Sequence, residues 1–428
     1  MALAGAVNAA LAAGTGLNQK RVGCVGRLIG IRMSTRKKKP EIKSLYYITH
    51  IENLPSIFSQ GILSHRQVID RGVDYSAIYD AAIVGNRKLK TTPDGRSLWD
   101  FANVYFQPRN PMLFRVVQEK GAKEIVVLGL QPRVLETPEA YITDGNAANN
   151  TTRFFDYKDG IEAVSAIWDT INSEWWNSVD GSKRKIMAEC LVPGSIPPDL
   201  IHSVYVANHH VADQVRAIIS PGDLPVIPEP NLFFIPARRY RITPDLFLAE
   251  GDMFFSNMQT LTVSVNTVGI MGKGLASRAK YQFPDVYVVY QDACRKKWLK
   301  MGKPYLYKRE ASFDDELIDE PGTIVTPNSI KWFLLFATKH HWRENSDIDG
   351  IEEGLRWIAA NYKSEGIKSI AMPALGCGLG NLDWTDVGPI MCRYLVQLEI
   401  PVAIYLPRER EIPPEFLKRE YLLAERAG

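Results

Sequence analysis

Two glycine-rich loops constrain this chain more than any other feature of its sequence. The first loop, Asn266-Thr-Val-Gly-Ile-Met-Gly-Lys-Gly-Leu275, follows the apolar run Leu261–Val265, and the second, Pro373-Ala-Leu-Gly-Cys-Gly-Leu-Gly380, follows Ile367–Ala371. Each apolar run predicts a buried strand, so each loop begins where a strand ends. Glycine lets backbone N–H groups approach phosphate oxygens that a side chain would keep away. One such loop can be a tight turn without a ligand, but two at strand ends predict a site for a diphosphate.

Length and composition indicate a folded protein with more than one domain. A chain of 428 residues exceeds what one core usually holds, so we expect two domains. The sequence is 46% hydrophobic and 23% charged and has no apolar run long enough for a membrane span. Its net charge of +3 argues neither for nor against nucleic acid. The five cysteines form no metal-binding or disulfide pattern, so we expect a metal-free protein of the reducing cytoplasm. We also expect a monomer.

The first 40 residues differ in composition from the rest. Met1–Arg32 is rich in alanine and glycine and then basic, and no acidic residue precedes Glu41. An arginine-rich, acid-poor segment is typical of an organellar targeting peptide. The alternative, which we favour, is an upstream extension in which Met33 is the true start. In both cases we expect residues 1–40 to be disordered.

A proline-rich stretch divides the chain near residue 240. The stretch 221–236 contains five prolines, and a basic segment follows it. Beyond it, apolar runs alternate with amphipathic segments, which predicts an α/β/α sandwich with helices on both faces of the sheet. The expected strands are 261–265, 332–336, 367–371 and 401–405, and the expected helices begin after Gly274 and cover 348–362 and 385–397. A charged helix is expected over 414–426.

The N-terminal half has a less regular pattern and predicts a mixed fold. We expect a helix over 53–60 that ends at Gly61, and another over 160–172. The expected strands are 45–49, 104–106, 112–117, 125–130, 187–191 and 203–207.

Glu189 is a lone acid inside an apolar strand that follows the basic cluster Lys183-Arg-Lys185. Neighbouring cations can hold such a carboxylate ionised, as a catalytic site would require. The alternative is an edge-strand glutamate that faces solvent. From these residues alone the solvent-facing alternative is favoured.

The glycine loops and their surroundings resemble the macrodomain family over residues 245–406. The resemblance is carried by Gly251-Asp252, both glycine loops, Phe283-Pro284 and Ala337-Thr-Lys-His-His-Trp342. It is greatest to the branch that includes DarG antitoxins and related DNA and glutamate ADP-ribosylhydrolases. The resemblance implies an α/β/α module that binds ADP-ribose and releases it from DNA, with Lys339 as a catalytic residue. A lysine with a lowered pKa can attack or polarise the sugar C1.

The macrodomain resemblance also implies the residues that contact ADP-ribose. They are Asp252, Asn266, Gly269, Met271, Gly272, Gly274, Gly376, Cys377, Gly378, Leu379 and Gly380. The protein-glutamate erasers carry an acidic residue at the position of Gly380, whereas DarG-like proteins often have glycine there. This departure favours the DarG type.

The N-terminal half resembles the DarT family over residues 44–236. The resemblance is carried by Tyr47–Leu54 with Gly61–Ser64, Asn86-Arg87, Tyr105–Met112, Thr143-Asp-Gly-Asn-Ala147 and Ala188–Val192. It implies an ADP-ribosyltransferase-like fold that moves ADP-ribose from NAD to a base of single-stranded DNA, typically thymine, without a metal. The implied catalytic residues are Glu189 and Arg87. Those implied to line the NAD pocket are Tyr47, Thr49, His50 and Asn53. Tyr157, Trp175 and Trp176 are candidates for stacking on the base, and the alternative for each of them is ordinary packing of a helix against the sheet.

The two resemblances together predict a fused writer and eraser of DNA ADP-ribosylation, with residues 407–428 as a tail. One alternative is an ADP-ribose-binding module joined to an inactive transferase scaffold. Another is a transferase whose acceptor is RNA, a protein or a different base.

Overall fold

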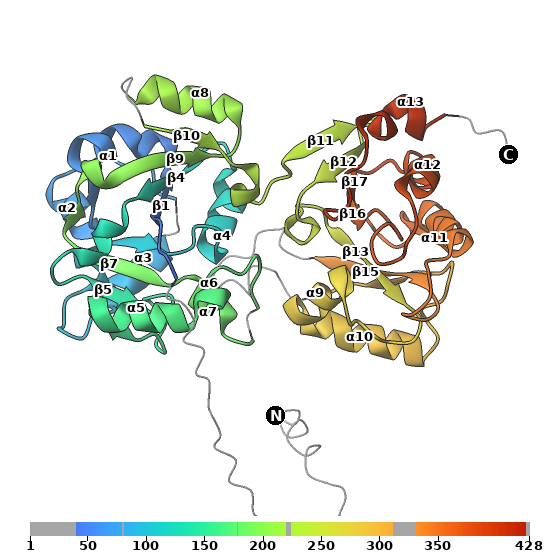
Figure 1. Ribbon diagram of the computed structural model, residues 1–428, viewed down its shortest axis with the longest axis horizontal. Helices are drawn as coiled ribbons and strands as arrows, with labels where there is room; N and C mark the ends of the chain where they lie inside the picture. The colour runs from blue at the N-terminus through green and yellow to red at the C-terminus, as the bar shows by residue number, and fades with distance from the viewer. Residues whose placement is uncertain (1–39, 79–80, 178, 220–223, 311–330, 425–428) are drawn as a thin grey trace, which may run out of the picture. The chain divides into compact units, whose positions relative to one another are not determined.

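Two sheets, one in each half of the chain, organise the computed structural model (Figure 1). The structure describes residues 40–424 except 79–80, 178, 220–223 and 311–330. The disorder expected for residues 1–40 falls, apart from Pro40, outside the described residues. No described helix is long and apolar enough to cross a membrane.

The N-terminal sheet has eight strands in the order β10-β9-β4-β1-β3-β7-β5-β6 and is antiparallel except between β9 and β10. Its strands are β1 Leu45–His50, β3 Phe101–Tyr105, β4 Ile125–Leu130, β5 Tyr141–Thr143, β6 Phe154–Phe155, β7 Glu189–Pro193, β9 Ile201–Val206 and β10 Val226–Pro228. A separate pair joins β2 Ile62–Leu63 to β8 Ser195–Ile196. The expected mixed fold is confirmed, and the catalytic candidate Glu189 is the first residue of β7.

Helices and short 3-10 turns surround this sheet. The helices are α1 Leu54–Gln60, α2 His65–Asp70, α3 Ala81–Leu89, α4 Pro111–Lys120, α5 Tyr157–Ala166, α6 Trp168–Ile171, α7 Ser182–Ile186 and α8 His209–Ile218. The 3-10 turns are η1 Ile51–Asn53, η2 Leu98–Asp100, η3 Pro132–Glu136, η4 Pro198–Leu200 and η5 Pro230–Phe233.

The strand predicted at 112–117 is wrong, because these residues belong to helix α4. Asn110 caps the helix by accepting the N–H of Leu113 at 3.0 Å, and Pro111 occupies its first turn. The buried residues Leu113, Phe114 and Val117 recur at helical spacing. The capping signal therefore outweighs the strand preference of the apolar run.

The C-terminal sheet has seven strands in the order β11-β12-β17-β16-β13-β15-β14. Its five central strands are parallel, and each edge strand is antiparallel to its neighbour. The strands are β11 Arg238–Arg241, β12 Leu246–Glu250, β13 Thr260–Asn266, β14 Tyr305–Tyr307, β15 Trp332–Lys339, β16 Ile370–Pro373 and β17 Val402–Tyr405. The helical elements are η6 Met253–Phe255, α9 Gly274–Gln282, α10 Pro284–Arg295, α11 Ile348–Asn361, α12 Trp384–Leu395, η7 Pro414–Leu417 and α13 Arg419–Leu422.

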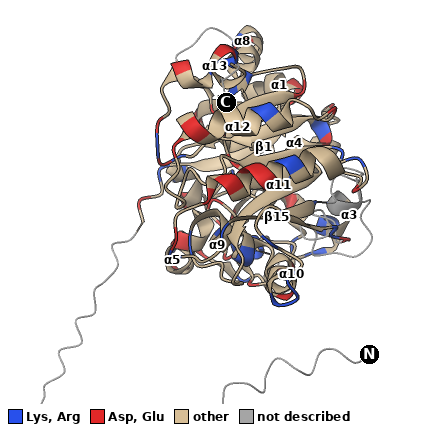
Figure 2. Ribbon diagram, turned by 90° about the vertical axis from the view of Figure 1, so that its right-hand side faces the viewer, with Lys and Arg blue, Asp and Glu red and all other residues tan. Residues whose placement is uncertain are grey.

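Helices cover both faces of this sheet, as the alternation of apolar and amphipathic segments predicts. Successive residues of β15 enter opposite cores: Phe333 and Leu335 pack with α9 and α10, while Leu334 and Phe336 pack with α11 and α12. Figure 2 shows α11 carrying both acidic and basic residues. Glu353 and Arg356 of this helix are exposed, whereas Ile351 and Leu355 are buried, which indicates a helix with one face on the sheet. The single charged helix predicted over 414–426 is instead the two short elements η7 and α13.

The carboxyl ends of three neighbouring parallel strands lie at one edge of this sheet. β13 ends at Asn266, β15 ends at Lys339 and β16 ends at Pro373, and β13 pairs with both of the others. In open α/β sheets, ligands bind at this edge. Both glycine loops therefore begin at the same edge of the sheet, and Lys339 lies there too.

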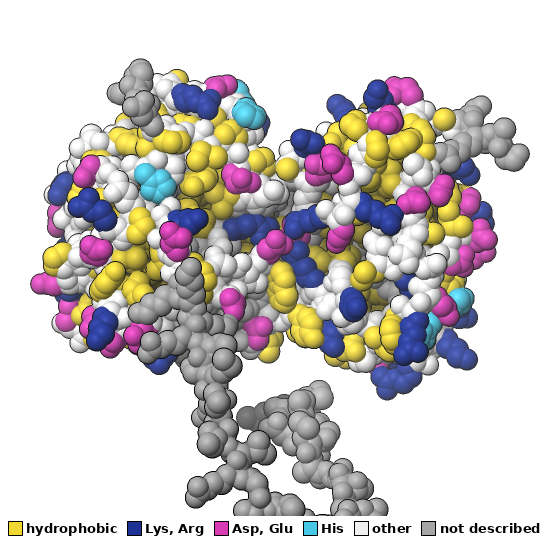
Figure 3. Space-filling model, viewed as in Figure 1, with side chains coloured by type: hydrophobic (Ala, Val, Ile, Leu, Met, Phe, Trp, Pro, Cys, Tyr) yellow, Lys and Arg dark blue, Asp and Glu magenta, His cyan; other side chains and the backbone are white. Residues whose placement is uncertain are grey.

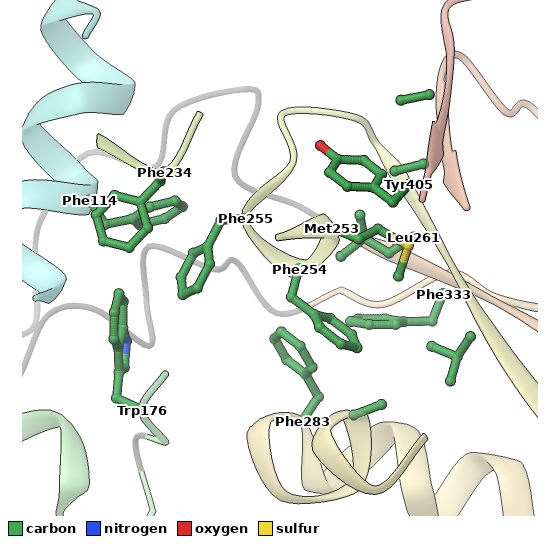
Figure 4. Close-up of a cluster of buried hydrophobic side chains, with 14 of the residues drawn as sticks. Phe114, Trp176, Phe234, Met253, Phe254, Phe255, Leu261, Phe283, Phe333 and Tyr405 are labelled. Atoms are coloured by element: carbon green, nitrogen blue, oxygen red, sulfur yellow. The ribbon is translucent and has the colours of Figure 1, made fainter. Parts of the chain in front are cut away.

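One hydrophobic cluster runs through both halves of the unit that begins at Pro40. In Figure 4, Phe255 of η6 lies among Phe114, Trp176 and Phe234 of the N-terminal half. Its ring centroid is 4.7 Å from that of Phe234, 5.1 Å from that of Phe114 and 5.2 Å from that of Trp176. The guanidinium of Arg109 stacks on Phe234 at 4.3 Å and on Phe255 at 4.8 Å. The two halves therefore share a core.

Replacing Phe255 tests the shared core. Phe255→Ala removes a buried ring from both halves, so we expect a loss of about 3–5 kcal/mol of stability. Calorimetry should show a lower unfolding midpoint, with the two halves now unfolding in separate transitions. Ile69→Ala, at a position 55% exposed, is the control and should change stability by less than about 0.5 kcal/mol. An unchanged midpoint for Phe255→Ala would contradict a core shared in solution.

Candidate active sites

Glu189 is fully buried, and its carboxylate has several partners in the protein. Its Oε1 accepts the backbone N–H of Ala147 at 2.9 Å, and its Oε2 lies 3.0 Å from Nη2 of Arg87. A second, longer contact of 3.4 Å joins Nη1 of Arg87 to Oε1, which makes the pair bidentate. The solvent-facing alternative for Glu189 is therefore wrong.

Arg87, the partner of Glu189, lines a cavity in the transferase half. Tyr47, Thr49 and Asn53 line the same cavity as Arg87, whereas Glu189 does not. Arg87 lies in α3 and Glu189 in β7, 102 residues further along the chain. The structure thus brings the two predicted catalytic residues together at the cavity wall.

A turn after β5 directs the amide of Ala147 at Glu189. Thr143 accepts the backbone N–H of Glu189 at 3.0 Å and donates its own proton to Gly145 O at 2.7 Å. Asp144 is buried and bound by Arg184 at 2.7 Å. Burial would raise the pKa of Asp144, but the backbone N–H of Arg153 and the Arg184 side chain outweigh it and lower the pKa. Asp144 therefore stays charged and pins the turn.

This supporting role could not be predicted from the sequence. The turn is recognisable as a motif, but the residue that its amide contacts depends on the pairing of β5 with β7. The basic cluster also has a different role from the one expected, because its Arg184 binds Asp144 while Arg87 from α3 binds Glu189.

Three of the four predicted NAD-pocket residues line the cavity, and His50 does not. Asn53 donates to the hydroxyl of Thr49 at 3.1 Å and to Ser76 O at 3.0 Å, so it fixes the end of β1 to the cavity wall. The His50 ring instead lies 3.3 Å from Glu124 and accepts the N–H of Glu52 at 3.3 Å. His50 therefore caps η1 away from the cavity.

The three aromatic candidates for base stacking have different environments. Trp176 is 4% exposed and belongs to the shared cluster, so it has no free face for a base. Trp175 is partly buried against the same cluster. Tyr157, at the start of α5, is 48% exposed and keeps its ring accessible.

In the macrodomain half, Asn266 shapes the first glycine loop from within. Its Nδ2 donates to Ile270 O at 2.7 Å, and its Oδ1 accepts the N–H of Val268 at 3.0 Å. Tyr290 also donates to Asn266. Burial raises the pKa of Tyr290, so its hydroxyl stays protonated and remains a donor. The buried Asn266 side chain therefore holds the loop in position.

The other predicted residues of the first loop are one buried methionine and three glycines, two of which have backbone angles that favour glycine. Met271 is 2% exposed and packs in the core. Gly269 and Gly274 have φ values of +84° and +60°, which disfavour any side chain. Gly272 has only Ile270 within 4 Å of where a Cβ would stand. Gly274 begins α9, whose N terminus has no side-chain cap.

The second loop meets the first through Leu379. A Cβ on Gly274 would lie 3.1 Å from Cδ1 of Leu379, so the two loops face each other. Leu379 is 63% exposed. Cys377 is buried, which raises the pKa of its thiol to about 12 and keeps it from acting as a nucleophile.

The second loop's glycines differ in the space around them. Gly376 has a φ of +75°. Gly378 has nothing within 4 Å of where a Cβ would stand, but at Gly380 a Cβ would lie 2.2 Å from Ser346 Oγ and 2.5 Å from Gly376 O. The structure therefore has no room for the acidic residue that the protein-glutamate erasers carry at this position.

Lys339 joins the end of β15 to the second loop. Its Nζ donates to Leu379 O at 3.0 Å and to Glu344 O at 2.8 Å. Partial burial lowers the pKa of Lys339, although the nearby Glu344 acts in the opposite direction. A lowered pKa increases the neutral fraction of the amine at a given pH, as a nucleophilic or proton-accepting lysine requires.

Asp252 lies where the two halves meet. Its Oδ2 is 2.8 Å from Arg278 of α9 and 3.5 Å from Arg109 of the transferase half, and its Oδ1 accepts the N–H of Phe254 at 3.1 Å. Burial lowers the pKa of Arg109 to about 10, so the guanidinium still carries its charge at neutral pH. Asp252, which is predicted to bind ADP-ribose, therefore already forms ion pairs with two arginines. Among the described residues, no group of three or more His, Cys, Asp or Glu side chains is placed to hold a metal ion.

Comparisons with known proteins match both halves. The family model described as "ssDNA thymidine ADP-ribosyltransferase, DarT" matches residues 46–234, and a macro domain model matches 327–391. A DNA ADP-ribosyl transferase–DNA ADP-ribosyl glycohydrolase fusion protein of Thermosipho africanus is 54% identical over 385 residues, which cover 90% of this chain and 99% of that protein. A DNA ADP-ribosyl glycohydrolase of Thermus aquaticus is 33% identical over 165 residues, which are 38% of this chain and 42% of that protein.

A solved structure has the same two-part fold. Thermosipho africanus DarTG in complex with ADP-ribose superimposes with a TM-score of 0.82 at 53% identity, and the match covers 89% of this chain and all of that one. These matches identify an enzyme in which a transferase domain precedes a macrodomain. The chain belongs to the family of DNA ADP-ribosyl transferase–DNA ADP-ribosyl glycohydrolase fusion proteins. Both resemblances given by the sequence are thereby confirmed.

The buried ion pair of the transferase half can be tested by removing first the arginine alone and then both charges. Arg87→Ala leaves the Glu189 carboxylate buried without its cation, so we expect a loss of about 3 kcal/mol of stability. The double variant Arg87→Ala/Glu189→Gln removes the charge and should recover most of that loss in thermal unfolding at neutral pH. Equal midpoints for Arg87→Ala and the double variant would show that the pair does not govern stability.

The crowding at Gly380 predicts a contrast between two glycines of one loop. Gly380→Ala forces Ser346 and the backbone of Gly376 to move, which should cost about 1–3 kcal/mol. Gly378→Ala meets nothing within 4 Å and should leave the unfolding midpoint nearly unchanged. Calorimetry of both variants provides the comparison, and similar midpoints would refute this account of the loop.

Proposed function

We propose that residues 44–236 transfer ADP-ribose from NAD to a thymine base of single-stranded DNA and that the macrodomain, residues 245–406, removes it. The observation that carries the proposal is the buried Glu189 carboxylate paired with Arg87 in the wall of a cavity. The DarT family model over this half and the fused relative support the reaction and the acceptor.

The transfer requires little more than placement of its reactants. The bond between C1 of the ribose and the nicotinamide nitrogen breaks, and its electron pair neutralises the positive ring. A base nitrogen forms the new bond to C1 and loses its proton. Glu189 would stabilise the positive charge that develops on the ribose, and Arg87 would orient the base. Because Arg87 covers Glu189, we propose that Arg87 turns toward the base when NAD enters.

The macrodomain would hold ADP-ribose at the edge where β13, β15 and β16 end. The N–H groups of the two glycine loops and the uncapped start of α9 suit a diphosphate. Lys339 would then lie beside the distal ribose, since its Nζ already contacts the second loop. Water would add to C1 as the base leaves.

Fusion places the eraser beside the writer's product. A tethered partner acts at a high effective concentration, so the macrodomain would remove ADP-ribose soon after its transfer. On the face shown in Figure 3, basic and acidic side chains are interspersed, in keeping with the small net charge. DNA binding would therefore depend on local contacts. The cytoplasmic location, the monomeric state and the absence of a metal remain predictions.

The main alternative is an inactive transferase scaffold joined to a working macrodomain. The intact Arg87–Glu189 pair and the Ala147 amide on the carboxylate argue against it, because an unused site has no need for a buried ion pair. RNA and protein are the alternative acceptors in the transferase reaction, and the mass of the product distinguishes them from DNA.

The balance between the two activities gives the decisive test. Purified protein incubated with NAD and a thymidine-containing oligonucleotide should yield little adduct, because the macrodomain removes it. Lys339→Ala should yield a large amount, and Lys339→Ala/Glu189→Gln none, as measured by mass spectrometry. If Lys339→Ala binds NAD but forms no adduct, the transferase assignment fails.

A further inference from the structure

A short turn, residues 340–344, lies between the two glycine loops. The backbone N–H and the hydroxyl of Thr267, in the first loop, both donate to His340 O at 3.1 Å. On the other side, the Lys339 amine donates to Leu379 O of the second loop and to Glu344 O of the turn. The turn is therefore fixed at both ends to the loops that would hold the diphosphate.

Trp342 projects from this turn with half of its surface exposed. Its exposed fraction is 47%. The Arg343 guanidinium lies 4.6 Å from the ring centroid of Trp342, and the His341 ring lies 5.2 Å away at an angle of 32°. His341 Nδ1 accepts the N–H of Arg343 at 3.3 Å, which ties the two supporting residues together. An exposed indole held by planar neighbours can accept another flat group on its surface.

A single exposed aromatic side chain needs no explanation by itself. Trp342 differs from such a residue in its position, three residues after Lys339. If the diphosphate spans the glycine loops and C1 of the distal ribose lies at Lys339, whatever is attached to C1 continues toward residues 340–344. The turn also carries the exposed Arg343, whose positive charge suits a polyanionic substrate.

We propose that Trp342 is the stacking platform for the ADP-ribosylated base of single-stranded DNA in the eraser reaction. This inference rests on the proposed function and assigns to Trp342 the distinction between DNA-linked and free ADP-ribose. Stacking on aromatic side chains is how proteins hold unpaired bases. In the reaction, the bond from C1 to the base nitrogen breaks, water supplies a hydroxyl to C1, and the proton goes to the base nitrogen. Trp342 keeps the leaving base in place during this step.

The test compares Trp342→Ala with two controls, all in full-length protein that carries Glu189→Gln to prevent new transfer. Trp342→Phe keeps an aromatic face. Trp298→Ala removes a tryptophan of matched exposure, 48%, whose ring is already stacked on Tyr305 at 5.8 Å and 16°. The substrate is a synthetic oligonucleotide with one ADP-ribosylated thymidine, and the readouts are kcat/KM for release and the Kd of free ADP-ribose.

We expect Trp342→Ala to lower kcat/KM for the oligonucleotide by roughly 5- to 150-fold, the range that the loss of one stacked base implies. Trp342→Phe should retain most of the activity and Trp298→Ala all of it. The Kd of free ADP-ribose should be the same in all of them. Unchanged release by Trp342→Ala would overturn the proposal, and so would an equal loss of affinity for free ADP-ribose.

A failure of the proposed function can be told apart from a failure of this inference. If the parent protein releases nothing from the oligonucleotide, the eraser assignment fails. The affinity of the Lys339→Ala protein for the same oligonucleotide then still tests the platform: a weaker affinity after Trp342→Ala supports stacking, and an unchanged affinity refutes it.

Discussion

A carboxylate without water around it must find all its partners in the protein, and this constraint on Glu189 organises the transferase half. The start of β7 brings Glu189 into the sheet, and its oxygens then require both a cation and an amide. Helix α3 supplies Arg87, and the turn after β5 supplies the Ala147 N–H. Because the same arginine also lines the cavity, satisfying the buried charge places a charged group in the cavity wall.

The macrodomain half depends on a geometric constraint of a different kind. Parallel strands that pair directly must end at the same edge, so the end of every such strand adds to one site. The edge receives the first loop from β13, the lysine from β15 and the second loop from β16. Hydrogen bonds from Lys339 to Leu379 O, and from Thr267 to His340 O, then join these three contributions into one surface.

The sequence reveals local patterns better than contacts made at long range. The strands β13, β15, β16 and β17 could be predicted because buried parallel strands are continuous apolar runs between amphipathic segments. The helix α4 could not, because its apolar residues suit either period and only the Asn110-Pro111 cap distinguishes them. Family resemblance named both Arg87 and Glu189 as catalytic residues, but their pairing could not be predicted, since 102 residues separate them. The burial of Trp176 depends on Phe255, which no local pattern can indicate.

The shared cluster around Phe255 has a consequence for how the two domains evolve. Phe114, Trp176 and Phe234 belong to the writer, while Phe255 belongs to the eraser, yet each ring packs against rings of the other half. Asp252 likewise faces Arg109 from the writer and Arg278 from the eraser. A substitution at these positions is selected through both enzymes at once. The sequences of the transferase and the macrodomain therefore cannot diverge independently at these positions, as those of two separately encoded chains could.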